Sequence, residues 1–365
     1  MVNTLVLQNL LRRPIRTLLS VIAVGVEITL ILTVVGLSHG MLEDSARRTR
    51  GVGADIIVRP SSAQAAMGFS TAEINEKLVA KLASLPQVAM TTGTTVYILQ
   101  GVLQTVTGID LESFSRMSGG LRYLAGGPFE RPYDAIIDDI WARQQKLHVG
   151  DTTQIWNRDF RVVGIVEPGK LSRIFIPLTT MQDLMGWQGK VSQIYVKLRD
   201  PNQTSAVIAD LKQMLPGYNI FSMEEFTSLF SINNIGGLDK FITVIIGLSV
   251  VIGFIVVMLS MYTAILERTR EIGILKSLGA SKLYIVGIVL RETVVLTLLG
   301  IGLGILFSFG AAAAIERNFP ILVVSLHRDW WLWASLIALG GAVLGALYPA
   351  VRAARQDPIA ALAYE

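Results

Sequence analysis

Residues 17–37 read TLLSVIAVGVEITLILTVVGL, an apolar run interrupted by one charged residue, Glu27. A bilayer core roughly 30 Å thick needs about 20 apolar helical residues to cross it. Three further runs meet that requirement, at residues 241–266, 283–315 and 330–351. The run at 283–315 carries Arg291 and Glu292 inside its first turns. The sequence therefore predicts an α-helical membrane protein with four transmembrane helices.

The overall composition agrees with a membrane protein. The 365 residues are 52% hydrophobic and only 16% charged, and the mean hydropathy is +0.52. A soluble enzyme is less apolar than this. The absence of cysteine excludes disulfides and thiolate metal sites. The pI of about 9.3 follows from basic residues beside the apolar runs, so we expect membrane lipid, and no nucleic acid, as a partner.

The spacing of the runs predicts three parts. Residues 1–40 form a cytoplasmic segment with the first transmembrane helix, residues 41–235 an extracytoplasmic α+β domain, and residues 236–365 the other three helices with a cytoplasmic C-terminus. In the domain, alternating strand and helix patterns predict compact α+β subdomains. Residues 73–86 are expected to form a helix, and the glycine-rich residues 118–129 an irregular loop or lid.

The orientation follows from the basic residues in the short flanks, which mark the cytoplasmic side. They are Arg12, Arg13, Arg16, Arg268, Arg270, Lys276, Lys282, Arg352 and Arg355. Both termini are therefore expected in the cytoplasm and the large domain outside. The first apolar run is too long for a cleavable signal peptide and fits an uncleaved signal anchor.

Two catalytic patterns occur by coincidence. Residues 164–170, GIVEPGK, fit the spacing of a phosphate-binding loop, but Leu171 replaces the hydroxyl that follows and no long helix is expected. Residues 36–40, GLSHG, fit the nucleophile pattern around Ser38, but they end a membrane helix instead of forming a strand-to-helix turn. His148 and His327 offer no triad or metal spacing. We expect no catalytic residue and no metal site.

Glu27 is the unusual residue of the first run. It lies near mid-membrane, where a charged side chain costs about 3 kcal/mol or more unless it is protonated, paired or wetted. Ser20 and Ala23 share its helical face. Two interpretations stay open: Glu27 has a role in substrate handling or gating, or it makes a buried interhelical hydrogen bond.

Glycine spacing predicts close helix packing. Gly300 with Gly304, and Gly341 with Gly345, form GxxxG patterns that let helix backbones approach in a membrane. Three further glycines are explained equally well by helix bending and by the ordinary composition of membrane helices. They are Gly247, Gly253 and Gly302.

Residues 265–284, ILERTREIGILKSLGASKLY, place charge between the second and third runs. Charges three residues apart favour a helix continuing from the second run. Ile272, Leu275 and Leu278 form a narrow apolar seam, Gly279 suits a helix end, and Ser281 suits the cap of the next helix. The segment is either a solvated connector or a helix that docks on a cytoplasmic partner.

Three segments resemble a known family. RTREIGILKSLGAS (268–281), YPAVRAARQDPIAALAYE (348–365) and GVGADIIVRPS (51–61) are similar to the signatures of the FtsX-like permeases, the group containing MacB, LolC and LolE. The resemblance implies a MacB-type periplasmic domain and the permease subunit of an ABC transporter in a bacterial inner membrane. It also implies that segment 267–281 contacts an ATPase. The implied contact residues are Glu267, Arg268, Arg270, Glu271, Ile272, Leu275, Lys276, Leu278 and Gly279.

The resemblance extends to partners and activity. Because only 16 residues precede the first run, we expect the ATPase, with its ATP and magnesium, to be a separate chain. A second permease copy, in a homodimer, and a periplasmic adaptor are further expected partners. The implied function is export or extrusion of an amphipathic substrate by ATP-driven movement of the external domains, called mechanotransmission. The alternative is a transmembrane regulator of an extracytoplasmic cell-wall hydrolase, and a third, minor hypothesis is a membrane-anchored hydrolase using Ser38.

Overall fold

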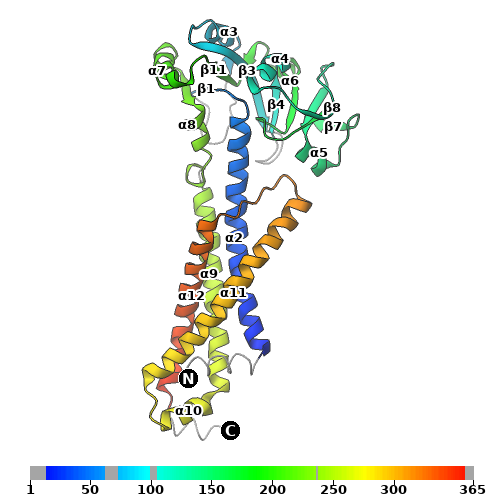
Figure 1. Cartoon of the computed structure of the whole chain (residues 1–365). Helices are drawn as coiled ribbons and strands as arrows, with labels where there is room; N and C mark the ends of the chain where they lie inside the picture. The colour runs from blue at the N-terminus through cyan, green and yellow to red at the C-terminus, as the bar shows by residue number, and fades with distance from the viewer. Residues whose placement is uncertain (1–13, 62–72, 99–104, 236, 358–365) are drawn as a thin grey trace. The chain divides into compact units, whose positions relative to one another are not determined.

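The computed structural model describes residues 14–61, 73–98, 105–235 and 237–357. It separates into two compact units (Figure 1). One unit comprises the described residues of Met1–Ser38, Gly237–Ile315 and Val324–Glu365. The other comprises those of His39–Gly236 and Glu316–Val323.

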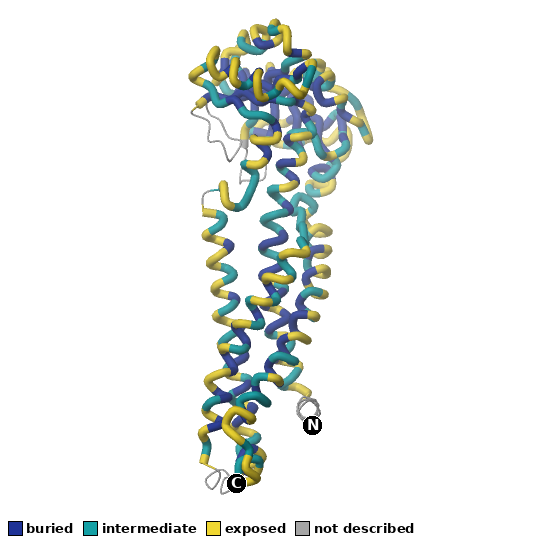
Figure 2. The backbone as a smooth tube through the Cα atoms, turned by 60° about the vertical axis from the view of Figure 1, so that its left-hand side comes forward, coloured by how far each residue is buried: buried dark blue, intermediate teal, exposed yellow. Residues whose placement is uncertain are grey.

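Among the described residues, four helices are long and apolar enough to cross a membrane: α2 (Pro14–Arg50), α9 (Leu238–Glu267), α11 (Lys282–Asn318) and α12 (Arg328–Arg355). Each contains one of the predicted apolar runs, so the prediction of four membrane helices is confirmed. A short helix, α10 (Thr269–Ser277), lies between α9 and α11. Exposed residues recur along the long helices in Figure 2, as expected of surfaces that contact lipid.

Both GxxxG patterns lie at helix contacts. A Cβ on Gly304 would lie 2.6 Å from the carbonyl oxygen of Gly25 on α2, and one on Gly300 would lie 2.6 Å from the Cβ of Val24. A Cβ on Gly345 would lie 2.7 Å from the carbonyl oxygen of Phe254 on α9. The absence of side chains therefore lets α11 approach α2, and α12 approach α9, as predicted.

The second unit is built on a ten-stranded mixed sheet with the order β12-β1-β11-β3-β4-β9-β6-β8-β5, and β7 pairs with β8. Its strands are β1 (Ile56–Pro60), β3 (Val88–Ile98), β4 (Thr105–Ile109), β5 (Tyr123–Gly126), β6 (Asp134–Asp138), β7 (Thr152–Ile155), β8 (Arg158–Val166), β9 (Ile174–Pro177), β11 (Gln193–Leu198) and β12 (Tyr218–Ser222). The α+β character of the domain is confirmed, and its two halves share one sheet, because β4 pairs in parallel with β9.

The helices of this unit are α3 (Lys77–Ala83), α4 (Leu111–Ser118), α5 (Asp139–Gln145), α6 (Leu178–Met185), α7 (Thr204–Met214) and α8 (Met223–Ser228), with 3-10 turns η2 (Pro201–Gln203) and η3 (Ile232–Asn234). The helix expected over residues 73–86 begins late, because β2 (Ile74–Asn75) pairs instead with β10 (Lys190–Val191). The loop expected over residues 118–129 contains the edge strand β5, which pairs with β8.

Side chains alternate between the two faces of the sheet. On β1, Ile57 packs with Phe114 and Phe175 in one hydrophobic cluster, while Ile56 and Val58 belong to another. The period of two is that of a strand buried on both faces. Helices cover the faces, and the sheet is mostly buried in Figure 2.

The last turns of α2 are fixed to this sheet by a chain of charged side chains that we call the outer ionic chain. Arg173, which precedes β9, donates to Asp44 of α2 at 2.8 Å and to Asp138 at 2.9 Å. Arg48 also donates to Asp44, at 3.0 Å. Asp138 caps α5 by accepting from the backbone N–H of Trp141. Burial raises the pKa of Asp138, and the Arg173 guanidinium opposes that shift.

Candidate functional site: the segment between α9 and α11

Helix α10 is a separate element with defined ends. The α9 helix stops at Glu267, and Arg268 leaves the helical conformation with φ −112° and ψ 16°. The predicted helix after the second apolar run is present, but Arg268 interrupts it and makes α10 a separate element. After α10, Gly279 has a φ of +93° and Ser281 Oγ accepts from the backbone N–H of Tyr284. The predicted stop and restart are confirmed.

The start of α10 is held to α11 by a buried ion pair. Arg268 donates to both carboxylate oxygens of Glu292, at 3.0 and 3.1 Å. The side chain of Glu292 is 3% exposed. A bidentate arginine–carboxylate pair is among the strongest and most directional ionic contacts in proteins. The first turn of α10 is thus fixed to a residue ten positions into α11.

The same carboxylate connects α10 to α2. Arg16, in the first turn of α2, donates to Glu267 at 3.0 Å and lies 3.7 Å from Glu292. Glu267, Arg16, Glu292 and Arg268 therefore form a continuous series of opposite charges, which we call the inner ionic chain. It joins the ends of α2 and α9 to the start of α10 and to α11.

The other end of α10 is fixed to α12. Lys276 donates to the carbonyl oxygen of Ala354 at 3.1 Å and also to that of Gln356. The lysine therefore caps the last turn of α12, where helix carbonyls lack partners. Nearby, the Arg352 guanidinium of α12 stacks 5.1 Å from the ring of Tyr262 on α9. Helix α10 is consequently held at both ends.

The predicted contact residues fall on two sides of α10. Ile272 is buried, whereas Leu278 is 81% exposed, so the predicted seam of Ile272, Leu275 and Leu278 does not lie on one face. Six residues turn an α-helix by roughly 240°, which separates its two ends. Arg270, Glu271, Ile274, Leu278 and Gly279 are on the exposed side.

A cavity of about 60 Å³ lies where α9, α10 and α11 meet. Leu275 and Ile272 line it together with apolar side chains of α9 and α11, and the charged Arg268 and Glu292 also line it.

Sequence reasoning missed Arg16, Glu292 and Ile274 as members of this site. The signal available was the carboxylate of Glu292 inside an apolar run, because such a residue requires a partner.

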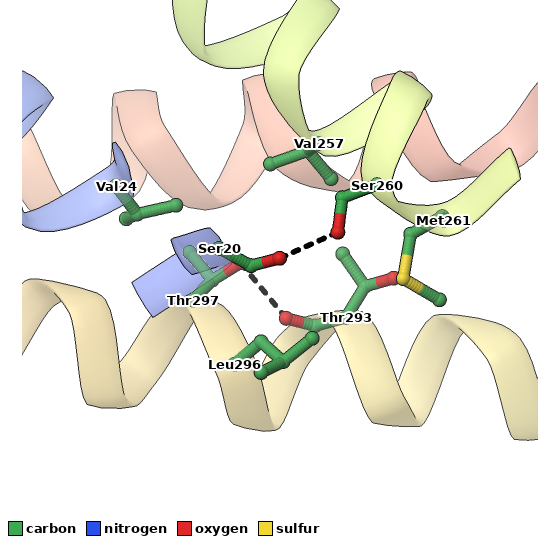
Figure 3. A pocket seen from close by; sticks show the side chains of 8 residues that line it. All are labelled: Ser20, Val24, Val257, Ser260, Met261, Thr293, Leu296 and Thr297. Atoms are coloured by element: carbon green, nitrogen blue, oxygen red, sulfur yellow. Dashed lines mark hydrogen bonds between the residues drawn. The ribbon is translucent and has the colours of Figure 1, made fainter. Parts of the chain in front are cut away.

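Further along the same helices, hydroxyl groups line a cavity of about 10 Å³ (Figure 3). Ser20 of α2 and Ser260 of α9 are hydrogen-bonded at 2.5 Å. Thr293 and Thr297 of α11 complete the polar lining. This volume is about the least that one water molecule needs. The hydroxyls form an uncharged polar contact between three membrane helices.

Glu27 lies beyond these hydroxyls on α2 and is 8% exposed. A Cβ on Gly253 of α9 would lie 1.9 Å from its carboxylate, so Gly253 makes room for Glu27. No hydrogen bond or ion pair joins Glu27 to another residue in the part of the chain that the structure describes. The neighbouring Ser20 carries an interhelical hydrogen bond, and the role of Glu27 stays a prediction.

The two coincidental patterns have other roles. Ser38 is helical and donates to the carbonyl oxygen of Val34. The expected helix end at residues 36–40 is wrong, because α2 continues to Arg50. Lys170 donates to the carbonyl oxygen of Ser118, and residues 164–170 lead from β8 toward β9. Neither pattern has the strand-to-helix turn that its chemistry requires.

Two protein families match the chain. The MacB-like periplasmic core domain matches residues 17–214, and the FtsX-like permease C-terminal domain matches residues 243–358. The ABC transporter permease YknZ of Bacillus subtilis is 30% identical over 60% of this chain and 57% of its own length. The macrolide export ATP-binding/permease protein MacB of Acinetobacter baylyi is 26% identical over 96% of this chain and 57% of its own length. The chain thus spans little more than half the length of these relatives.

Among solved structures, the periplasmic region of MacB from Actinobacillus actinomycetemcomitans matches 52% of this chain and 97% of that structure, with 16% identity and a TM-score of 0.37.

The first family covers more than half of this chain, and the second covers the other membrane helices. The chain is therefore a multi-pass membrane protein with a periplasmic α+β domain between its first and second membrane helices. It belongs to the MacB-like and FtsX-like family of ABC transporter permeases.

Proposed function

We propose that this chain is the permease subunit that couples ATP hydrolysis on a separate ATPase chain to movement of its periplasmic domain. ATP and magnesium are bound by the ATPase. The permease works as a homodimer in a bacterial inner membrane, with both termini in the cytoplasm. The movement exports or extrudes an amphipathic substrate, together with a periplasmic adaptor.

The observation that carries this proposal is the two-sided arrangement of α10. Its inward side is fixed to α11 through Arg268 and to α12 through Lys276. Its outward side exposes apolar residues, Ile274 and Leu278, next to the charged Arg270. A rigidly held helix with an exposed apolar stripe is suited to receive a partner and to pass on its movement.

The basic residues around α10 support its cytoplasmic location. Arg270, Lys276 and Lys282 lie within one short connection between two membrane helices. Basic residues in such connections favour the cytoplasmic side. An ATP-binding partner is accessible from that side alone, so the location and the proposed partner agree.

The substrate class rests on relatives. The MacB proteins of several bacteria are named for macrolide export, and macrolides are large and amphipathic. The match to the periplasmic core domain over residues 17–214 supports a similar use of the external domain.

The test is retention of the ATPase subunit by variants of the exposed side of α10. Leu278→Glu combined with Arg270→Glu removes the apolar contact and reverses one charge without touching the inward anchors. We expect retention to weaken by at least about tenfold, which corresponds to about 1.4 kcal/mol. Leu124→Glu, at a similarly exposed leucine of the periplasmic domain, is the control and should retain the ATPase fully.

Two results would overturn the proposal. One is undiminished retention of the ATPase by the double variant. The other is a purified complex that contains a cell-wall hydrolase and no transport adaptor, which would favour the regulator of a hydrolase instead. A complex with an adaptor supports export.

A further inference from the structure

We propose that Glu292 is a positioning residue that passes movement of α10 to α2, through exchange of Arg16 between two carboxylates. This inference rests on the proposed function, because it names the residues by which force from the ATPase enters the membrane helices. It concerns the inner ionic chain, which comprises Glu267, Arg16, Glu292 and Arg268.

The distances distinguish a fixed contact from an adjustable one. Arg268 binds both oxygens of Glu292 at 3.0 and 3.1 Å, which is a bidentate pair. Arg16 is 3.0 Å from Glu267 but 3.7 Å from Glu292. The first pair fixes the start of α10 to α11, while Arg16 already lies between two alternative partners.

The burial of the side chains also distinguishes the fixed contact from the adjustable one. The side chain of Glu292 is 3% exposed, that of Arg268 is 12% exposed, and that of Glu267 is 42% exposed. A buried carboxylate requires its partners, because a buried charge without compensation is costly. An exposed carboxylate is hydrated and releases its partner at little cost. The contact of Arg16 with Glu267 is therefore the most hydrated point of the chain, where a change of partner costs least.

Covalent geometry links this hydrated contact to α10. Glu267 is the last residue of α9 and Arg268 the residue before α10, so a tilt of α10 moves both side chains together. Movement of Glu267 away from Arg16 favours closer approach of Arg16 to the nearby Glu292 carboxylate, and the start of α2 shifts toward α11. Such a pair of discrete arrangements is the element that mechanical coupling requires.

The attachment of α10 to α11 and the proposed exchange of Arg16 both depend on Glu292. It binds Arg268 directly and is the second partner of Arg16. Glu292→Gln keeps the shape of the side chain but removes the charge that attracts both arginines. The exposed face of α10 is unchanged in that variant. We therefore expect the ATPase to bind normally while its movement is no longer passed to α2.

The experiment measures a distance within the membrane helices of the full ATPase–permease complex. The wild-type chain contains no cysteine, so Val26→Cys on α2 and Leu306→Cys on α11 introduce the only labelling sites of the permease. Both wild-type side chains are exposed. Nitroxide labels at these sites are measured by pulsed electron paramagnetic resonance with and without ATP and vanadate, using a cysteine-free ATPase subunit.

The experiment has three readouts: the distance between the labels, the retention of the ATPase and the rate of ATP hydrolysis. In the labelled permease without further change, ATP and vanadate shift the distance between the labels. In Glu292→Gln, the ATPase is retained and hydrolyses ATP within about twofold of the unchanged complex, but the shift is lost. Arg291→Gln, at the exposed neighbouring residue of α11, is the matched control and keeps the shift.

A full shift in Glu292→Gln would overturn the inference and leave the proposed function intact. Failure of the unchanged complex to bind an ATPase, or to shift with ATP, would overturn the proposed function and the inference with it. If Glu292→Gln does not assemble, Arg268→Lys replaces it, because lysine keeps the charge and loses the bidentate geometry. A reduced shift is expected there, and a full shift contradicts the role of this pair.

Discussion

Two ionic chains contact α2, and they differ in how deeply they are buried. In the outer chain, the side chains of Asp44, Arg173 and Asp138 are all less than 8% exposed. In the inner chain, exposure rises from 3% at Glu292 to 42% at Glu267. In the outer chain both carboxylates are closed to water, and only arginines that bind Asp44 reach the surface, Arg48 at 13% and Arg47 at 67% exposed. In the inner chain a carboxylate itself, that of Glu267, is hydrated.

This difference separates a structural role from a mechanical one. Charges that are fully buried must keep their partners, because separating them leaves a charge in a medium of low dielectric constant. Charges with a hydrated end exchange partners at little cost. We infer that the outer chain stabilises the periplasmic unit and that the inner chain permits rearrangement in the membrane unit.

Arg173→Met should cause the largest loss of stability. The change leaves two buried carboxylates, Asp44 and Asp138, without their shared arginine, and breaking a buried pair costs about 3–5 kcal/mol. Thermal unfolding of the purified chain measures the effect on the periplasmic unit. Arg161→Met is the control, because Arg161 is 48% exposed and lies 3.6 Å from Asp134; it should cost less than about 1 kcal/mol. Equal losses would show that burial does not set the strength of the outer chain.

Gly304→Leu should destabilise the contact between α2 and α11 in the membrane unit. Any side chain there meets the backbone of Gly25 and the side chain of Ile28, and overpacking typically costs about 1–3 kcal/mol. Gly302→Leu, two residues away in open space, is the matched control. Stability of the chain in detergent against heat distinguishes the two. A similar loss in both variants would contradict close packing of α2 on α11.

Gly253→Ala should cost about 1 kcal/mol through a clash with Glu27, because the added Cβ meets only the end of that flexible side chain at less than 3 Å. In a Glu27→Ala background the same change should cost nothing measurable. A double-mutant cycle on thermal stability provides the coupling energy. Additive effects would place Glu27 away from Gly253 and would weaken the case for a specific site on α2 between the ionic chains.

The smallest effect should be the pH dependence contributed by Asp138. Burial raises the pKa of Asp138, so the folded state binds this proton more tightly than the unfolded state does. Its contribution to stability is full below the pKa of the unfolded chain and is lost as the pH rises through the folded pKa. Relative to Asp138→Asn, the wild-type chain should lose stability as the pH rises through that interval. A constant difference would contradict the burial of this carboxylate.

Some elements could be predicted from the sequence because their causes are local. The four membrane helices follow from apolar length, and the stop at Gly279 and the cap at Ser281 follow from turn chemistry. Helix α4 was missed although Asp110 caps it and Gly119 ends it. Asp110 and Gly119 flank the eight residues of this helix, and a capping aspartate followed at that distance by a glycine predicts a short helix.

Other features depend on contacts between distant residues, and no local pattern reports them. The pairing of β4 with β9 merges the expected subdomains, and the pairing of β2 with β10 removes Ile74 from the expected helix. In the candidate site, Arg268 binds a carboxylate 24 residues away, and Arg16 contacts one 251 residues away. The sequence identified the segment, while the division between its fixed and exposed sides required the structure.

The central claim is that the exposed side of α10 contacts the ATPase while its inward side is held within the permease. Site-directed photocrosslinking from a single cysteine tests it most directly, because the wild-type chain has none. A probe at Leu278→Cys should crosslink to the ATPase subunit, and a probe at Leu306→Cys, on an exposed membrane-helix position, should not. An ATPase crosslink from position 306 and none from position 278 would contradict the account.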